Sequence, residues 1–174
     1  MVDGGFVWGS KIVHHILTNQ LAIYRNYEIW SLLEGQPIRF SLHEFSDITC
    51  LNSDPYATDE TLSIEHRDLW GLMKVDEGAG PNWNELSDAL TYARTWEPEK
   101  RKMLGQLFVV HVGILGLARA SMIPLEYAKL VLDAATFESF PWGRLGFKHL
   151  IEFIKVVSYE NTGYAIHGCV NALL

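Results

Sequence analysis

The stretch IRFSLHEFSDITCL, residues 38–51, carries the most consistent folding signals in the chain. Ser41 is followed three residues later by Glu44, which is the spacing of a capping box at a helix N-terminus. Phe40 and Phe45 flank this pair at the positions of a hydrophobic staple, which sets the angle at which the chain enters the helix. We therefore predict a helix beginning after Ser41. Its period turns three apolar side chains inward: Leu42, Phe45 and Ile48.

The residues before this helix predict a small β-hairpin near residues 28–40. Two short apolar runs, residues 28–33 and 38–40, are separated by Glu-Gly-Gln-Pro, a sequence rich in turn formers. A further short strand is predicted near residues 164–166.

The rest of the chain predicts mainly helices, because apolar residues recur at the helical period. The predicted segments are residues 11–19, 63–73, 82–93, 98–119, 124–132 and 145–157. The segment 98–119 leaves almost no polar face, so we expect other helices to surround it. The predicted fold class is mainly α (α+β): a single-domain helical bundle with a small hairpin. We expect it to span residues 6–174, truncated at its C-terminal end, with residues 1–5 flexible.

An aromatic corner interrupts the helices at residues 137–144, FESFPWGR. Pro141 disfavours helix at Phe140, and Gly143 is expected to supply a backbone conformation closed to other residues. Two interpretations of Trp142 and Arg144 remain open. In the structural one, Trp142 fills the core while Arg144 caps a carbonyl or meets a carboxylate. In the functional one, both belong to a partner-binding surface, because Trp and Arg are enriched among interface anchors.

Composition argues against two classes of partner. The chain of 174 residues has a formal net charge of −7, with acidic residues crowded into its middle, which disfavours nucleic acid. Nucleic-acid binding would require a contiguous basic patch. The residues that could form it are Lys100, Arg101, Lys102, Lys148 and Lys155. The longest apolar run, residues 107–118, is too short for a membrane span. Only two cysteines and no signal-peptide profile favour a reducing, intracellular compartment.

No metal, cofactor or catalytic motif is recognisable in the sequence. Neither Cys50 nor Cys169 stands in a protease signature, and His111 within an apolar helix is best interpreted as a hydrogen-bonded core residue. A non-catalytic protein-interaction module is therefore preferred. The alternative is a ligand-binding or enzymatic domain whose site is assembled from His43, His66 and Cys50.

Several motifs together resemble a known plant domain of unknown function. They are Glu28-Ile29-Trp30, residues 35–45, Thr49-Cys50-Leu51-Asn52, residues 140–144 with Phe147, and residues 164–168 with Ala172-Leu173. That family is known mainly from Brassicaceae-type proteins of transposon origin, and it often precedes a Ulp-type cysteine protease domain that cleaves SUMO-like modifiers. The resemblance implies a protein partner and a nuclear location, and supplies no catalytic residues. Cys50 stands where the family more often has Gly, and Ser53 where it often has Cys.

Overall fold

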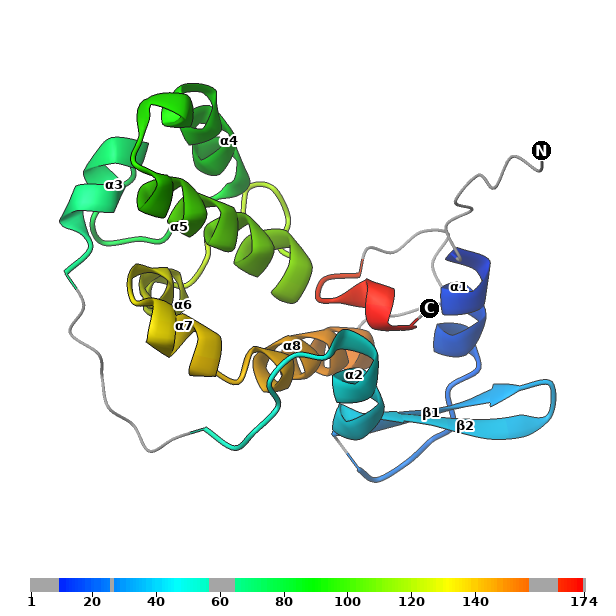
Figure 1. The fold of residues 1–174 in the computed structure, drawn as a ribbon. Helices are drawn as coiled ribbons and strands as arrows, with labels where there is room; N and C mark the ends of the chain where they lie inside the picture. Colours follow the sequence, from blue (N-terminus) through cyan, green and yellow to red (C-terminus); the bar gives the residue numbers. More distant parts are fainter. Residues whose placement is uncertain (1–9, 26, 57–64, 157–165, 174) are drawn as a thin grey trace, which may run out of the picture.

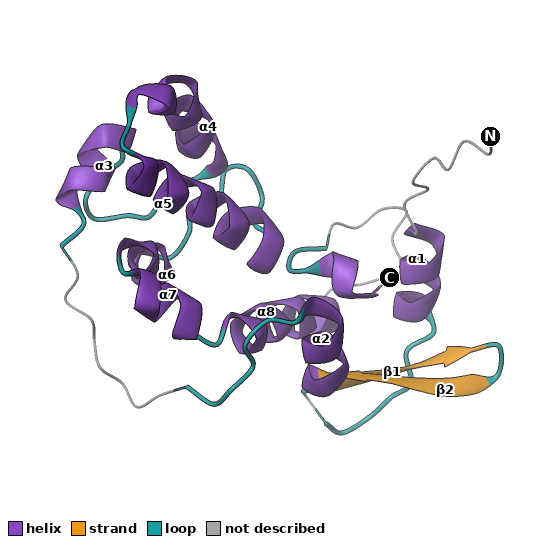
Figure 2. Cartoon of the chain, viewed as in Figure 1, coloured by secondary structure: helices purple, strands orange, loops and turns teal. Residues whose placement is uncertain are grey.

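The computed structural model describes residues 10–25, 27–56, 65–156 and 166–173. The fold is mainly α (α+β), as predicted, with one antiparallel two-stranded sheet among the described residues. Figures 1 and 2 show two groups of elements on either side of helix α8 (Trp142–Val156). The first described helix, near the start of the chain, and the last described residues, near its end, lie on the side that carries the hairpin.

The group nearer the chain ends contains the hairpin. Its elements are α1 (Ser10–Thr18), β1 (Glu28–Leu33), β2 (Gln36–Ser41), α2 (Leu42–Thr49) and the short 3-10 helix η4 (Val170–Leu173). Phe45 and Leu17 are at the centre of its core, where α1, β1, α2 and α8 meet.

The second group is entirely helical. Its elements are α3 (Arg67–Met73), α4 (Trp83–Tyr92), η1 (Ala93–Thr95), α5 (Pro98–Phe108), η2 (Val109–Ile114), α6 (Leu125–Ala128), η3 (Lys129–Leu132) and α7 (Ala134–Ser139). Its core surrounds Trp70, which is fully buried and whose Nε1 donates to the Ala79 carbonyl over 2.7 Å.

Helix α8 joins the two groups, because its first turns and its later turns are buried in different cores. Trp142 and Leu145 pack with the helical group, whereas Phe147, Leu150 and Ile154 pack with the hairpin group. A side chain on α8 can therefore contact segments from both halves of the chain.

The predicted hairpin is confirmed. Glu28 pairs with Ser41 and Leu33 with Gln36, which leaves Glu34 and Gly35 as a two-residue turn. Both turn residues have positive φ, 49° and 80°, as a type I′ turn requires. The strand β1 also contacts residues 19–21 on its other side, through Leu21 N to the Trp30 carbonyl at 2.7 Å. Among the described residues, β2 is therefore the edge strand.

The predicted capping box at the start of α2 is confirmed in both halves. The Ser41 amide donates to Glu44 Oε2 over 2.8 Å, and Arg39 Nη2 lies 2.6 Å from Glu44 Oε1. Phe45 is fully buried, but Ile48 is 56% exposed, so its predicted inward orientation is wrong. The short helix α2 packs on α8 and the hairpin through one narrow face, and Ile48 falls outside that face.

Substituting Glu44 with glutamine is expected to remove a pH-dependent part of the stability. Burial acts to raise the pKa of Glu44, but hydrogen bonds from Ser41 and Arg39 outweigh it and lower the pKa to about 2. Since an unfolded glutamate titrates near pH 4.3, the ionised carboxylate stabilises the fold above roughly pH 5, and this contribution is lost as the pH falls towards 2. Glu44→Gln should lower the free energy of unfolding by roughly 1 kcal/mol at pH 7.

Urea unfolding of both proteins at a series of pH values measures this effect. The two free energies should converge as the pH approaches about 2. Glu138→Gln, which removes an exposed carboxylate with no ion pair in the described part of the chain, is the control. A difference that is constant with pH would contradict the assignment.

Several predicted boundaries need correction. The segment 98–119 is not one α-helix. The α-helix α5 ends at Phe108, the π-helical turn η2 follows, and the helical part of this segment ends at Ile114. Nor is it surrounded, because Val109 and Val112 are about half exposed. The helix predicted from residue 63 begins at Arg67, and 124–132 divides into α6 and η3. Residues 1–5, 63–64 and 164–165 lie outside the described residues, and Ile166 is in no strand.

Candidate functional site

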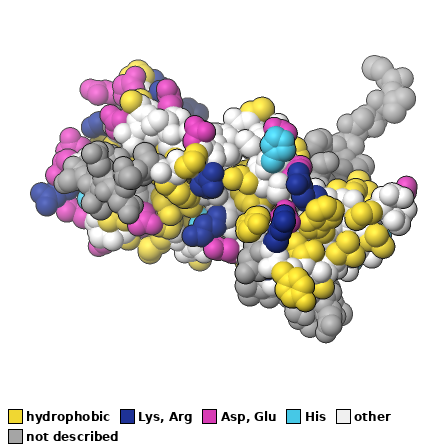
Figure 3. Space-filling view, turned by 90° about the horizontal axis from the view of Figure 1, so that it is seen from below, with side chains coloured by type: hydrophobic (Ala, Val, Ile, Leu, Met, Phe, Trp, Pro, Cys, Tyr) yellow, Lys and Arg dark blue, Asp and Glu magenta, His cyan; other side chains and the backbone are white. Residues whose placement is uncertain are grey.

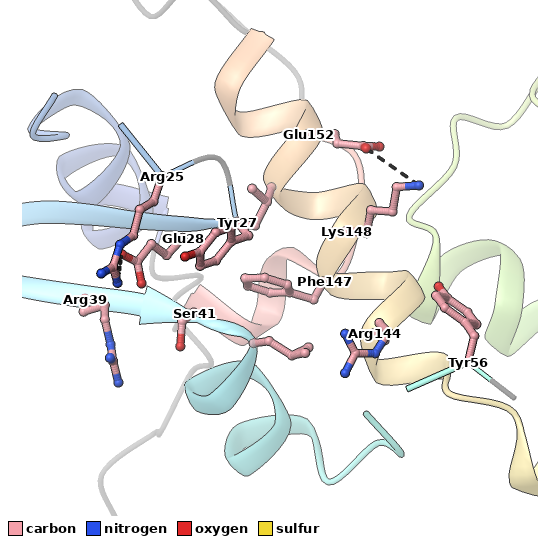
Figure 4. Close-up of a pocket in the computed structure, with 12 residues that line it drawn as sticks. Arg25, Tyr27, Glu28, Arg39, Ser41, Tyr56, Arg144, Phe147, Lys148 and Glu152 are labelled. Carbon is pink, nitrogen blue, oxygen red and sulfur yellow. Dashed lines mark hydrogen bonds and ion pairs between the residues drawn. The ribbon is translucent and has the colours of Figure 1, made fainter. Parts of the chain in front are cut away.

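A surface pocket of about 670 Å³ lies where the hairpin and the start of α2 face α8 (Figure 4). Its lining combines charged, aromatic and aliphatic side chains from four parts of the chain. The lining residues are Arg25, Tyr27, Glu28, Arg39, Ser41, Leu42, Tyr56, Arg144, Phe147, Lys148, Ile151 and Glu152.

Helix α8 supplies one wall of the pocket through a single stripe of side chains. The stripe consists of Arg144, Phe147, Lys148, Ile151 and Glu152, spaced by three and four residues so that they share one helix face. Phe147 and Ile151 are buried, and the Phe147 ring is held 6.0 Å from the Phe40 ring and 5.6 Å from the Phe45 ring. They form an apolar floor, while the charged members of the stripe lie nearer to solvent.

One end of the pocket is formed by the start of β1. Glu28 is buried, and its Oε1 accepts from Arg25 Nη1 at 3.4 Å and Trp30 Nε1 at 3.2 Å. Lys155 Nζ donates to the Arg25 carbonyl over 2.6 Å. Burial lowers the pKa of Lys155, and the negative charge of Glu28 opposes that shift. The carboxylate of Glu28 is therefore compensated within the protein.

The opposite end of the pocket is formed by Arg144 and Tyr56 (Figure 4). Arg144 Nε donates to the Asp54 carbonyl and Nη2 to the Ser53 carbonyl, each over 2.9 Å. Burial raises the pKa of Tyr56, and the positive charge of the neighbouring Arg144 acts against this shift. Both acceptors of Arg144 are neutral, so no carboxylate among the described residues forms an ion pair with this guanidinium.

The pocket is cationic although the chain is acidic. Four cationic side chains line it against two carboxylates, whereas the whole chain carries a net charge of −7. Figure 3 shows Lys and Arg side chains beside hydrophobic ones on the right-hand half of one face, while most acidic side chains on that face lie to the left. Such a pocket attracts negative charge and can also bury apolar surface.

The two partner-binding residues predicted from the sequence occupy different environments. Trp142 is only 5% exposed, its Nε1 donates to the Phe137 carbonyl over 2.7 Å, and its ring lies 4.6 Å from that of Phe140. Its place is in the aromatic corner, as in the structural interpretation. Arg144 caps two carbonyls, as that interpretation also expected, yet it lines the pocket as well.

The role of Gly143 in the aromatic corner differs from the predicted one. It lies within helix α8 and has no positive φ, so the expected special backbone conformation is wrong. Instead its amide donates to the Asn52 carbonyl over 2.7 Å, at the point where residues 51–53 cross the start of α8. Asn52 Nδ2 in turn donates a hydrogen bond to the Ser139 carbonyl, also over 2.7 Å. This crossing brings Ser53 and Asp54 within reach of Arg144.

The alternative site of His43, His66 and Cys50 is not assembled in the structure. His43 is exposed beside Asp47, Cys50 is exposed at the end of α2, and His66 Nε2 lies 2.8 Å from the Glu77 carbonyl. Figure 1 shows α2 and α3 in different halves of the molecule, and none of the three residues lines the pocket. Cys50 has a left-handed backbone conformation, φ 55°, at the C-terminal end of α2, where Gly is the residue that adopts this conformation most readily.

Of the basic residues considered as a nucleic-acid-binding patch, Lys148 alone lines the pocket, and the buried histidine does not line it. Lys100, Arg101 and Lys102 are on α5, away from Lys148 and Lys155 on α8 (Figure 1), so these five do not form one patch. His111 is buried, with Nε2 3.0 Å from the Ser121 carbonyl, as predicted for a core residue. Within the described ranges, no group of three or more potential ligands could hold a metal ion, and no helix could cross a membrane.

The fold and the pocket together define a helical α+β domain with a cationic, partly apolar surface pocket. The chain belongs to the family described as "Domain of unknown function (DUF1985)", whose model matches residues 17–153. Neither the curated proteins nor the solved structures contain a match to this chain.

Most pocket residues could not be identified from the sequence, although one signal was available. Arg144, Phe147, Lys148, Ile151 and Glu152 recur at helical spacing and mix charge with large apolar groups on one face. The contributions of Arg25, Arg39 and Tyr56 had no such signal, because they come from separate segments.

Proposed function

We propose that this chain is a protein–protein interaction module and that the pocket beside α8 is its binding surface. The observation that carries the proposal is the composition of the pocket: a buried aromatic and aliphatic floor with arginines and tyrosines at its edge. Specific interfaces are built in this way, from apolar anchors at the centre, a polar rim, and enrichment in Tyr and Arg.

The exposure of the pocket aromatics supports a macromolecular partner. Tyr27 is 64% and Tyr56 49% exposed, and they line the pocket near its two ends. Large exposed aromatic groups offer contact area at low cost in side-chain entropy. A partner segment lying along the pocket would cover both of them.

The cellular setting is a second part of the proposal and rests on the family resemblance of the motifs. We infer that the chain acts in a plant nuclear or transposon-derived protein, in which it recruits a partner for a Ulp-type protease domain. A fluorescent fusion of the full-length protein in its own cells tests the location. Exclusion from the nucleus would overturn that part alone.

Affinity capture with matched variants tests the binding function. The chain, Lys148→Glu and Lys102→Glu are used as baits in extract from cells that make the protein, and captured proteins are quantified by mass spectrometry. Lys148 lines the pocket with only a 3.9 Å contact to Glu152, and Lys102 is exposed on α5, so both substitutions reverse one charge on a helix surface.

We expect a set of proteins captured equally by the wild type and Lys102→Glu and lost with Lys148→Glu. Circular dichroism and thermal melts of the three baits establish that they are equally folded. If every protein captured by the wild type is retained by Lys148→Glu, the pocket is not the binding surface.

A further inference from the structure

We propose that the pocket beside α8 binds an acidic peptide segment of its partner, with a large apolar side chain placed between carboxylates. This inference rests on the proposed interaction function and names the chemistry of the partner.

At the end of the pocket that Arg144 and Tyr56 form, two cationic side chains are not strongly paired with carboxylates of the described residues. Arg144 directs Nε and Nη2 at neutral carbonyls, so its positive charge meets no carboxylate in the described part of the chain. Lys148 lies one helical turn further on, and its contact with Glu152 spans 3.9 Å between two side chains that are each 64% exposed. Such an exposed pair holds its members weakly. A carboxylate from outside can therefore bind at Arg144 and Lys148.

This end of the pocket is also held in place before any partner arrives. Arg144 is fixed by two hydrogen bonds to residues that lie 90 and 91 positions earlier in the chain. A guanidinium ordered in this way loses little freedom on binding, and it presents its remaining N–H groups in a fixed geometry. This favours a planar carboxylate as its ligand.

An apolar floor lies next to these cations. Phe147 and Ile151 are buried between Lys148 and the hairpin, and Leu42 borders the same space. A leucine or phenylalanine side chain on the peptide would cover this surface while neighbouring aspartates or glutamates meet Arg144 and Lys148. The pocket thus recognises alternation of acidic and apolar groups, not charge alone.

The same features favour a peptide over nucleic acid. Two carboxylates, the buried Glu28 and the exposed Glu152, belong to the lining and interrupt the positive charge that a continuous phosphate backbone would need. The basic residues on α5 do not belong to the lining, so they do not extend the pocket into a longer basic track. The cationic groups therefore suit a short acidic segment.

Fluorescence anisotropy with labelled peptides tests the proposal. The probe is a short peptide in which aspartates and glutamates flank a central Leu-Phe pair. One control replaces the acids by asparagine and glutamine, and another replaces Leu-Phe by Ser-Ser. Each is titrated with the wild type, Lys148→Glu and Lys102→Glu, at low and high salt. A labelled single-stranded oligonucleotide is titrated in parallel, and sedimentation measures self-association.

We expect the acidic apolar peptide to bind the wild type and Lys102→Glu alike, and Lys148→Glu about tenfold or more weakly. Both control peptides should bind about tenfold or more weakly than the probe, and salt should weaken binding of the probe.

Three results would overturn the proposal: equal binding of the neutral peptide, tighter binding of the oligonucleotide, or self-association that depends on Lys148. Affinity capture that depends on Lys148, combined with no peptide selectivity, would leave the interaction function standing and refute only the acidic partner.

Discussion

Replacing Gly143 with alanine is expected to destabilise the protein by about 2 to 3 kcal/mol. A Cβ on Gly143 would lie 2.9 Å from the carbonyl oxygens of both Leu51 and Asn52 and would also strike the Ser53 hydroxyl. The carbonyls are backbone atoms, so relief requires residues 51–53 to move away from α8. That movement would break the bond from the Gly143 amide to Asn52 and release the carbonyls that hold Arg144.

Gly105→Ala is the matched control for this prediction. Gly105 is also within a helix, α5, and nothing lies within 4 Å of a Cβ built there. Alanine has the higher helix propensity, so Gly105→Ala should stabilise the protein by about 0.5 to 1 kcal/mol. Urea unfolding measures both changes. If Gly143→Ala also raises the stability, the close crossing of residues 51–53 over α8 is not present in solution.

Truncating Phe45 to alanine is expected to cost about 3 to 5 kcal/mol, because Phe45 is fully buried where α2, the hairpin and α8 meet. Its ring lies 6.3 Å from that of Phe40 and 5.6 Å from that of Phe147. The cavity left behind would also free Phe147, which forms part of the pocket floor. Peptide binding should therefore weaken together with stability.

Ile48→Ala provides the comparison on the same helix. The sequence pattern assigns Phe45 and Ile48 to the same inward face, but Ile48 is 56% exposed in the structure. Its truncation should change the free energy of unfolding by less than about 0.5 kcal/mol. Equal losses from the two substitutions, measured by urea unfolding, would show that α2 is rotated relative to the structure.

The hairpin, the start of α2 and the start of α4 could all be predicted because their signals are local. The hairpin turn consists of Glu34 and Gly35 alone. A capping box needs only a polar residue and an acid three positions later, as at Asn82 and Glu85 at the start of α4. These interactions are complete within a few residues. They form in the same way whatever the distant parts of the chain do.

Helix ends and exposed faces were predicted less well. The apolar run after Phe108 continues the helical period, but the chain changes to a π-helical turn and leaves Val109 and Val112 half exposed. Periodicity reports which residues can share a face. Which face is covered depends on the elements that pack there, and a single segment carries no information on them.

The pocket shows most clearly the difference between what local sequence determines and what tertiary packing determines. The stripe on α8 is encoded by spacing alone, and the corner that holds Trp142 follows from Pro141 and its aromatic neighbours. The environment of Arg144 is different, because its hydrogen-bond partners lie 90 and 91 residues away. Short-range chemistry thus determined the elements of this protein, from the capped helix at Ser41 to the face of α8. Only tertiary packing decided which cations, aromatic rings and carbonyls meet, because contacts between distant segments depend on how all the elements pack together.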